Sequence, residues 1–149
     1  MKKKNALNED YVISVLARIE RDDDAPEKVD FVTRGSFVHR GSSYYITYQE
    51  TEAIGYAGCV CTVKVSEDGS RVSLIRFGNP SSTLLVEKGR RNLCHYETPY
   101  GGLTLGVTAD EIDSGLSDKG GRLQLSYLLD LNSTPMSRNS MDITVRHVN

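Results

Sequence analysis

The chain has 149 residues, and 18 Lys and Arg against 20 Asp and Glu give it a formal net charge of −2. This length fits a single domain, and the 37 Val, Ile, Leu and Phe residues are enough for a hydrophobic core. The near-neutral charge disfavours a nucleic-acid binder, for which an excess of basic residues is expected. No apolar run exceeds three residues, so we expect no transmembrane helix and no membrane partner.

The cysteine count and the start of the chain bear on the cellular compartment. The three cysteines, Cys59, Cys61 and Cys94, are an odd number, and the charged start lacks the apolar stretch of a secretory leader. Both observations favour a reducing, cytoplasmic setting over a disulfide scaffold. We expect residues 1–10 to form a frayed, disordered N-terminus and residues 11–149 to form a single domain.

Composition and periodicity both favour β-strands. Val, Thr, Ile and Tyr are plentiful, whereas Ala, the best helix former, occurs six times. The capping-box spacing of Thr108 and Glu111 leaves open either a short helix or a strand that runs to Ile112. Four stretches alternate apolar and polar residues, which predicts strands with one buried face. In chain order they are Tyr11–Ile19, Leu103–Ala109, Leu123–Leu131 and Met141–His147.

Residues typical of turns interrupt the chain at nine places, which predicts about ten strands, most of them paired in hairpins. The Asp68-Gly69 turn gives the clearest hairpin, between Cys59–Ser66 and Arg71–Phe77. The nine breaks lie at Asp22–Pro26, Arg40–Ser42, Thr51–Gly58, Asp68–Gly69, Gly78–Ser81, Lys88–Gly89, Pro99–Gly102, Ser114–Gly121 and Asn132–Pro135.

The predicted strands must protect their edges, and closing the sheet into a barrel does so completely. A two-layer sandwich is the competing arrangement. Short consecutive connections favour the barrel, and so do three glycines within or beside strands, Gly35, Gly58 and Gly106, which suit the bends at barrel corners. We therefore predict an all-β, antiparallel up-and-down β-barrel of about 8–10 strands, wide enough for one small ligand.

Six short motifs occur in an order that is found in a known protein family. They are Thr33-Arg34-Gly35, Tyr44–Glu50, Thr62–Val65, Arg76-Phe77-Gly78, Tyr96–Gly101 and Leu123–Asn132. In this order they resemble the YwiB-like family of small bacterial proteins of unknown function, over roughly residues 10–148. The resemblance implies a calycin (lipocalin-like) barrel in the cytoplasm of a Firmicute-type bacterium. It implies no established activity and carries over no catalytic residues.

A set of arginine, tyrosine and histidine residues is the candidate ligand-binding site. Small-ligand pockets are mostly apolar with a few convergent polar groups, and an inward-pointing arginine would bind an anionic head group with tyrosine hydroxyls assisting. The competing interpretation places Arg34 and Arg76 outside in weak surface ion pairs, and it is favoured because Arg34 alternates with Phe31 and Phe37. The candidate residues are Arg34, Tyr45, Tyr48, Arg76, His95, Tyr96, Tyr100 and Tyr127.

The cysteines give a weaker indication of a metal site. Cys59 and Cys61 share a strand face, and Cys94 or His95 would be the third ligand. The spacing lacks the paired C-x-x-C pattern of zinc sites, and small buried thiols fit the core. We therefore expect core packing, with no metal and no cofactor.

Catalytic and nucleic-acid functions have less support than ligand binding. His95 and Glu97 share a strand face, but no nucleophile motif accompanies them, so we expect a solvent-facing pair rather than a catalytic dyad. The basic Lys88–Arg91 tip fits a solvated turn better than a nucleic-acid contact. The sequence thus predicts a non-enzymatic barrel that binds a small amphipathic ligand in its lumen. The ligand would be anionic if an arginine points inward. The alternative is a protein-interaction or regulatory module with a solid barrel core, and a homodimer stays open.

Overall fold

The computed structural model describes residues 10–49, 59–78, 81–98 and 100–148, and the regular elements in these ranges are all β-strands. Of the predicted frayed terminus, residues 1–9 lie outside the described residues. The strands in chain order are β1 (Tyr11–Glu20), β2 (Glu27–Arg40), β3 (Ser43–Gln49), β4 (Val60–Ser66), β5 (Arg71–Phe77), β6 (Ser82–Glu87), β7 (Arg91–Thr98), β8 (Gly101–Ser117), β9 (Gly120–Leu131) and β10 (Thr134–His147).

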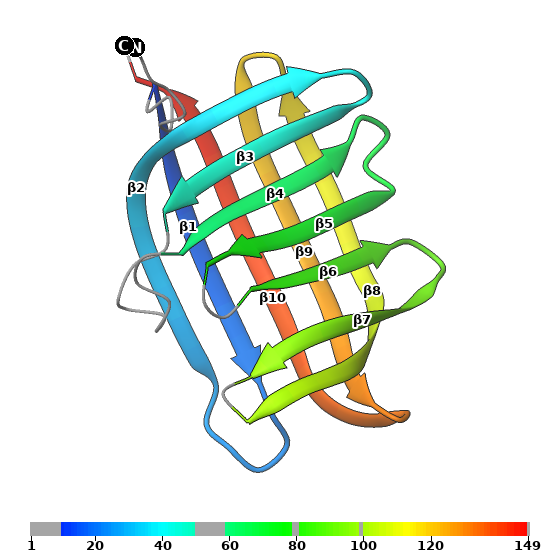
Figure 1. Ribbon diagram of the computed structural model, residues 1–149. Coiled ribbons are helices and arrows are strands. Elements are labelled where there is room, and N and C mark those ends of the chain that lie inside the picture. Colours follow the sequence, from blue (N-terminus) through cyan, green and yellow to red (C-terminus); the bar gives the residue numbers. More distant parts are fainter. Residues whose placement is uncertain (1–9, 50–58, 79–80, 99, 149) are drawn as a thin grey trace.

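The strands form one closed barrel, in which each strand pairs antiparallel with the next along the chain and β1 pairs with β10 (Figure 1). Ten residue pairs, from Tyr11↔His147 to Glu20↔Arg138, join the first strand to the last. The prediction of an all-β, antiparallel up-and-down barrel is therefore confirmed, and the sandwich is excluded.

Alternation of side chains explains the hydrophobic interior. On β4 and β5 the buried residues alternate with more exposed ones: Cys61, Val63 and Val65 are buried on the first strand, and Val72 and Leu74 on the second. Paired residues point to the same side of a sheet, so such rows continue from strand to strand around the barrel. Burial of each aliphatic side chain of this size stabilises the fold by roughly 1.5–3 kcal/mol.

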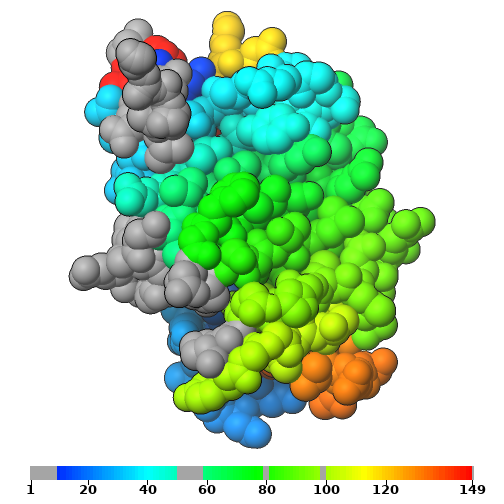
Figure 2. Space-filling model, in the orientation of Figure 1, coloured from blue at the N-terminus to red at the C-terminus, as the bar shows by residue number. Residues whose placement is uncertain are grey.

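The strands fall into a short group and a long group, and this difference shapes the interior. Strands β3 to β7 have 6 to 8 residues each, whereas β1, β2, β8, β9 and β10 have 10 to 17. The long strands extend past the short ones at the lower end of the barrel, where blue residues of β1 and β2 come into view below the green strands (Figure 2).

The upper end of the barrel is filled by aromatic rings. Tyr11 meets Phe37 edge to face with their centroids 5.5 Å apart, and Phe37 stacks on Tyr44 at 5.7 Å. Below them, Ile13 and Ile46 are fully buried. The upper half of the lumen is therefore solid core.

Three hairpins at the upper end are joined by one histidine, in an arrangement that we call the His39 clasp. The two ring nitrogens of His39 hydrogen-bond to the carboxylates of Glu67 and Asp118, which lie in the β4–β5 and β8–β9 turns. The imidazole also stacks on Tyr44 at 4.3 Å. The hydrogen bonds to Glu67 and Asp118 raise the pKa of His39 above its usual 6.5, because both carboxylates favour the charged ring.

One seam of the barrel has few main-chain contacts. Within the described residues, Ser82↔Tyr96 is the one registered pair between β6 and β7. Nearer the hairpin, side chains replace the ladder: Asn92 donates through Nδ2 to the Leu85 carbonyl (3.3 Å), and the Leu85 N–H donates to the Cys94 thiol (3.4 Å). This β6–β7 seam is therefore held by fewer backbone hydrogen bonds than its neighbours.

The predicted Asp68-Gly69 hairpin is present between β4 and β5. Gly69 takes a φ of +73°, and the Asp68 carboxylate accepts hydrogen bonds from the Ser66 hydroxyl (2.8 Å) and from the Ser70 hydroxyl (2.7 Å) and N–H (3.0 Å). These bonds stabilise the charged carboxylate and lower the pKa of Asp68 to about 2.

The structure also decides between helix and strand near Thr108 and defines the turn between β8 and β9. Thr108 and Ile112 belong to β8, so the strand alternative is correct, with a bulge between Ala109 and Glu111 that absorbs the irregular spacing. The predicted Ser114–Gly121 break is shorter than expected, because β8 continues to Ser117 and β9 begins at Gly120. The Thr51–Gly58 break lies wholly outside the described residues.

Gly35 lies where β2 passes from one neighbour to the next, since it pairs with Tyr11 on β1 and with Tyr48 on β3. A Cβ atom at this position would lie 2.3 Å from the Thr47 carbonyl oxygen and 2.5 Å from the Ile13 Cδ1 atom. Real side chains do not approach this closely, so the corner requires glycine. Of the other two predicted corner glycines, Gly106 lies in β8 and Gly58 lies outside the described residues.

We expect Gly35→Ala to lower the free energy of unfolding by about 1–3 kcal/mol, because the added methyl group must displace backbone. Gly115→Ala is the matched control, since its Cβ would meet nothing nearer than the Arg122 carbonyl oxygen at 3.4 Å. The control should change stability by less than about 0.5 kcal/mol in urea unfolding. Equal losses in both variants would contradict the corner argument.

We expect the His39 clasp to stabilise the fold below pH 6.5 and to lose this contribution as the pH rises through the raised pKa of folded His39. His39→Gln keeps a polar side chain but cannot titrate, so its stability should depend less on pH across this window. Urea midpoints on both sides of the window test this. Parallel pH profiles for the two proteins would rule out the clasp as a source of pH dependence.

Candidate functional site

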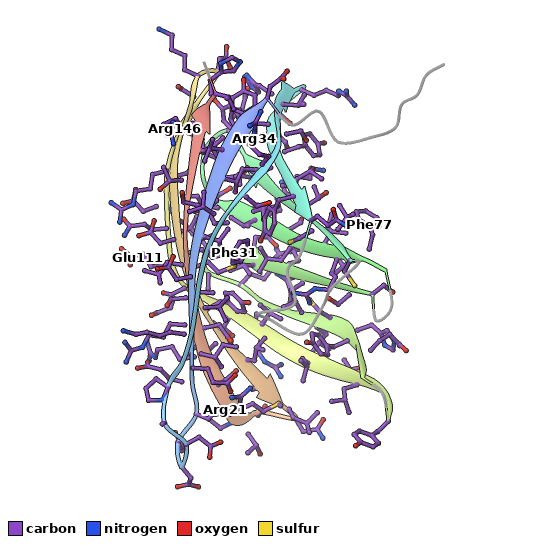
Figure 3. The ribbon with its side chains drawn as sticks, turned by 90° about the vertical axis from the view of Figure 1, so that its left-hand side faces the viewer. Arg21, Phe31, Arg34, Phe77, Glu111 and Arg146 are labelled. Carbon is purple, nitrogen blue, oxygen red and sulfur yellow. The ribbon has the colours of Figure 1, made fainter. Side chains whose placement is uncertain are left out.

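The lower half of the lumen contains a cavity of about 390 Å³ that opens at the lower end of the barrel. Small-molecule pockets typically measure roughly 300–1,000 Å³, so this space suits a small ligand. Figure 3 shows the two walls from the side: the long strands, with Glu111 and Arg146 pointing outward, and the short strands, one of which ends at Phe77. Interior side chains lie between these walls.

A continuous row of polar side chains crosses the short-strand wall of the cavity. The row follows directly registered pairs across five adjacent strands, and paired side chains share a face. Each member also lines the cavity. Its members, which we call the polar row, are Tyr48, Cys61, Arg76, Ser82 and Tyr96, on β3, β4, β5, β6 and β7.

The row next to the polar row, towards the upper end, is entirely apolar. Ile46 pairs with Val63, Val63 with Leu74, and Leu74 with Leu84. All four side chains are buried. Leu74 and Leu84 also line the cavity, so the solid core gives way to the cavity between this apolar row and the polar row.

The wall opposite the polar row is mainly apolar. Strands β1 and β10 lie about half-way round the barrel from β5, and their neighbour β2 continues the same wall. The lining residues Val15, Ala17, Val29, Phe31 and Met141 come from these strands. One side of the cavity thus offers a row of polar side chains, and the other offers chiefly hydrocarbon. The polar members of this second wall are Asn139 and Ser140 on β10 and the charged Arg18 and Glu27.

Tyr127 on β9 extends the polar group deep into the cavity. Its side chain is buried, and burial raises the pKa of its phenol well above the usual 10, with Tyr96 adding to the rise and Arg76 opposing it. The phenol is therefore a neutral hydroxyl close enough to Arg76 and Tyr96 to interact with both electrostatically. Asn139, its cross-strand partner on β10, is also buried and donates through Nδ2 to the Ser137 hydroxyl (3.0 Å).

Charged side chains surround the lower opening in ion pairs. Arg18 binds Glu20 at 2.9 Å, and Arg21 binds Glu27 across the β1–β2 turn. Arg18 and Glu27 are also lining residues of the cavity. The opening therefore carries charges of both signs, while the interior holds Arg76.

The structure brings together four of the eight predicted site residues, Tyr48, Arg76, Tyr96 and Tyr127. Arg76 points inward because it alternates in step with Val72 and Leu74, so the favoured outward interpretation is corrected for this residue. For Arg34 the outward interpretation agrees with the structure, because its side chain is exposed on β2.

The other three predicted residues also lie away from the cavity. Two of them point to the outer face of the barrel, and the third lies in a turn. Tyr45 carries the Lys64 ammonium 5.7 Å from its ring centroid on the outer face. His95 is exposed and paired with Glu97, and Tyr100 is 99% exposed in the β7–β8 turn. The expectation that all eight form one site is thereby corrected to the four that line the cavity.

Sequence reasoning missed several polar lining residues, among them Cys61, Ser82 and Asn139. Cys61 was assigned to the core alone, although it lies both in the core cluster and in the cavity wall, and Ser82 and Asn139 were not singled out. Each falls on the inward phase of its strand, so alternation alone would have found them. In the part of the chain that the structure describes, no group of three or more His, Cys, Asp or Glu side chains could hold a metal ion.

Comparisons with known proteins agree with this architecture. A model of the family described as "Domain of unknown function (DUF1934)" matches residues 13–143. The uncharacterized beta-barrel protein YwiB of Bacillus subtilis (strain 168) is 26% identical over 123 residues, covering 83% of this chain and 84% of that protein. A crystal structure of the ywiB protein from Bacillus subtilis matches with a TM-score of 0.77 at 24% identity, covering 93% of this chain and 92% of that chain. The resemblance inferred from the six motifs is thus confirmed.

The comparisons identify a fold and a family without an activity. Neither relative's description mentions a ligand, a substrate or a partner. Over the described ranges, no helix is long and apolar enough to cross a membrane. Any function must therefore be argued from the cavity itself.

We expect iodoacetamide to modify Cys61 before Cys94 in the native protein. Both thiols are buried, but Cys61 lines the open cavity, whereas Cys94 lies outside it and accepts a hydrogen bond from the Leu85 N–H. Peptide mass spectrometry after timed labelling measures both rates in one sample, and labelling in urea supplies the rates of the unfolded chain. Faster native labelling of Cys94 would contradict access through the cavity.

Proposed function

This chain belongs to the DUF1934 family, and since the description of that family names no activity, we propose from the cavity that the barrel binds a small amphipathic molecule in its lower lumen. The single observation that carries the proposal is the pairing of a polar row with an apolar wall across one open cavity. A pocket with this division suits a molecule that has one polar end and one hydrocarbon end.

The proposed role is binding rather than catalysis. Acid–base chemistry most often uses histidine, and the described lining residues include none. His95 and Glu97, the one acid–base pair that the sequence suggested, lie exposed on the outer face. A reducing cytoplasm suits the role, because Cys59, Cys61 and Cys94 are buried and none of them forms a disulfide.

The alternative of an interaction module with a solid core has weaker support. The upper half of the lumen is solid, but the cavity leaves the lower half open to a small molecule. Exposed apolar residues such as Leu93 and Val32 lie on different strands, and scattered single residues are normal on a protein surface.

We expect the neutral dye N-phenyl-1-naphthylamine to bind the protein with a rise in fluorescence, and Ala17→Phe to abolish this by filling the cavity from β1. Thr144→Phe is the control, since it places the same ring on an exposed position of β10. Native mass spectrometry of protein purified from its own host should show a co-purified small molecule that Ala17→Phe lacks. Dye binding that is absent, or equal in the two variants, would sink the proposal.

A further inference from the structure

The hydrogen-bond donors of the cavity are gathered at one corner. Arg76 and Tyr96 belong to the polar row, and Tyr127 lines the same cavity from β9, where it interacts electrostatically with both residues. These three side chains come from β5, β7 and β9, so the corner is assembled by the closed fold rather than by one hairpin.

The geometry points to a ligand with a single carboxylate head group, which Arg76, Tyr96 and Tyr127 bind while its hydrocarbon chain lies on the wall formed by β1, β2 and β10. This inference rests on the proposed function and specifies its ligand class. A planar guanidinium binds a carboxylate through two parallel hydrogen bonds, and such charge-assisted bonds are about twice as strong as neutral ones. The neutral phenol of Tyr127 adds a donor that stays protonated.

The charges of the cavity favour one negative charge over two. Among the described lining residues inside the opening, Arg76 is the charged one, and its companions Tyr96, Tyr127 and Ser82 are neutral. Arg18, a lining residue at the opening, and Arg21, in the adjoining β1–β2 turn, are bound to Glu20 and Glu27. A dianionic phosphate would therefore meet carboxylates at the opening and one guanidinium inside.

The wall opposite Arg76 provides the apolar surface on which the hydrocarbon chain of the ligand would lie. Val15 and Ala17 on β1 and Val29 and Phe31 on β2 are directly paired, Val15 with Phe31 and Ala17 with Val29. These two pairs form a continuous apolar surface inside the cavity. Each methylene group buried on it contributes to affinity without a directional contact.

The test compares octanoate with octan-1-ol, which share a chain and differ in the charged head group, as competitors of bound N-phenyl-1-naphthylamine. Wild-type protein should bind octanoate more tightly than octan-1-ol. Arg76→Met should weaken octanoate binding by about tenfold or more and leave octan-1-ol within about twofold, because one charge-assisted contact is lost. Arg34→Met is the matched control, since it removes the same charge from an exposed position of β2.

Tyr127→Phe is the second variant, which removes the hydroxyl while keeping the ring that fills the interior. It should weaken octanoate several-fold and leave dye binding unchanged. If Arg76→Met and Arg34→Met affect octanoate equally, or if both competitors weaken together, the carboxylate inference is overturned while dye binding still supports the proposed function. If the wild-type protein fails to bind the dye, the proposed function itself fails.

Discussion

The pairing of β1 with β10 is the constraint on which the rest of this structure depends. Ten consecutive residue pairs join the two ends of the sheet, and nine more join β1 to β2. A strand slipped by one residue would turn its whole apolar face to solvent, so closure at this register fixes which residues face the lumen on every strand. The solid core, the polar row and the apolar wall all follow from which alternate residues of each strand point into the lumen.

Because the strands differ in length, the interior of the barrel is solid in its upper half and contains a cavity in its lower half. Where the short strands are present, rings and aliphatic side chains from opposite walls meet, and the interior packs solidly around Ile13, Ile46 and Val63. Where the short strands end, the long strands lose their partners across the lumen and a cavity remains. The polar residues lie at this boundary. Each occupies an inward position near the lower end of a short strand, where its side chain does not have to pack into the solid core.

Local sequence rules predict much of this fold and only part of the site. Alternation and turn residues identify the strands and the Asp68-Gly69 hairpin because both signals are local. The same alternation places Arg76 inside, in step with Val72 and Leu74, once the phase of the strand is taken from its buried residues. The convergence of Tyr127 with Arg76 depends instead on closure between strands that lie about fifty residues apart in the chain, and no local pattern encodes it.

The β6–β7 seam is the place where the barrel wall opens locally most easily. Resistance to local opening comes chiefly from backbone ladders and buried contacts, and the described residues provide one registered pair here against ten at the β1–β10 closure. Local opening of the wall is therefore favoured along this seam, between the Ser82↔Tyr96 pair and the β6–β7 hairpin, while the β1–β10 closure stays paired over its whole length. The weakest part of the wall thus adjoins a residue pair that lines the cavity.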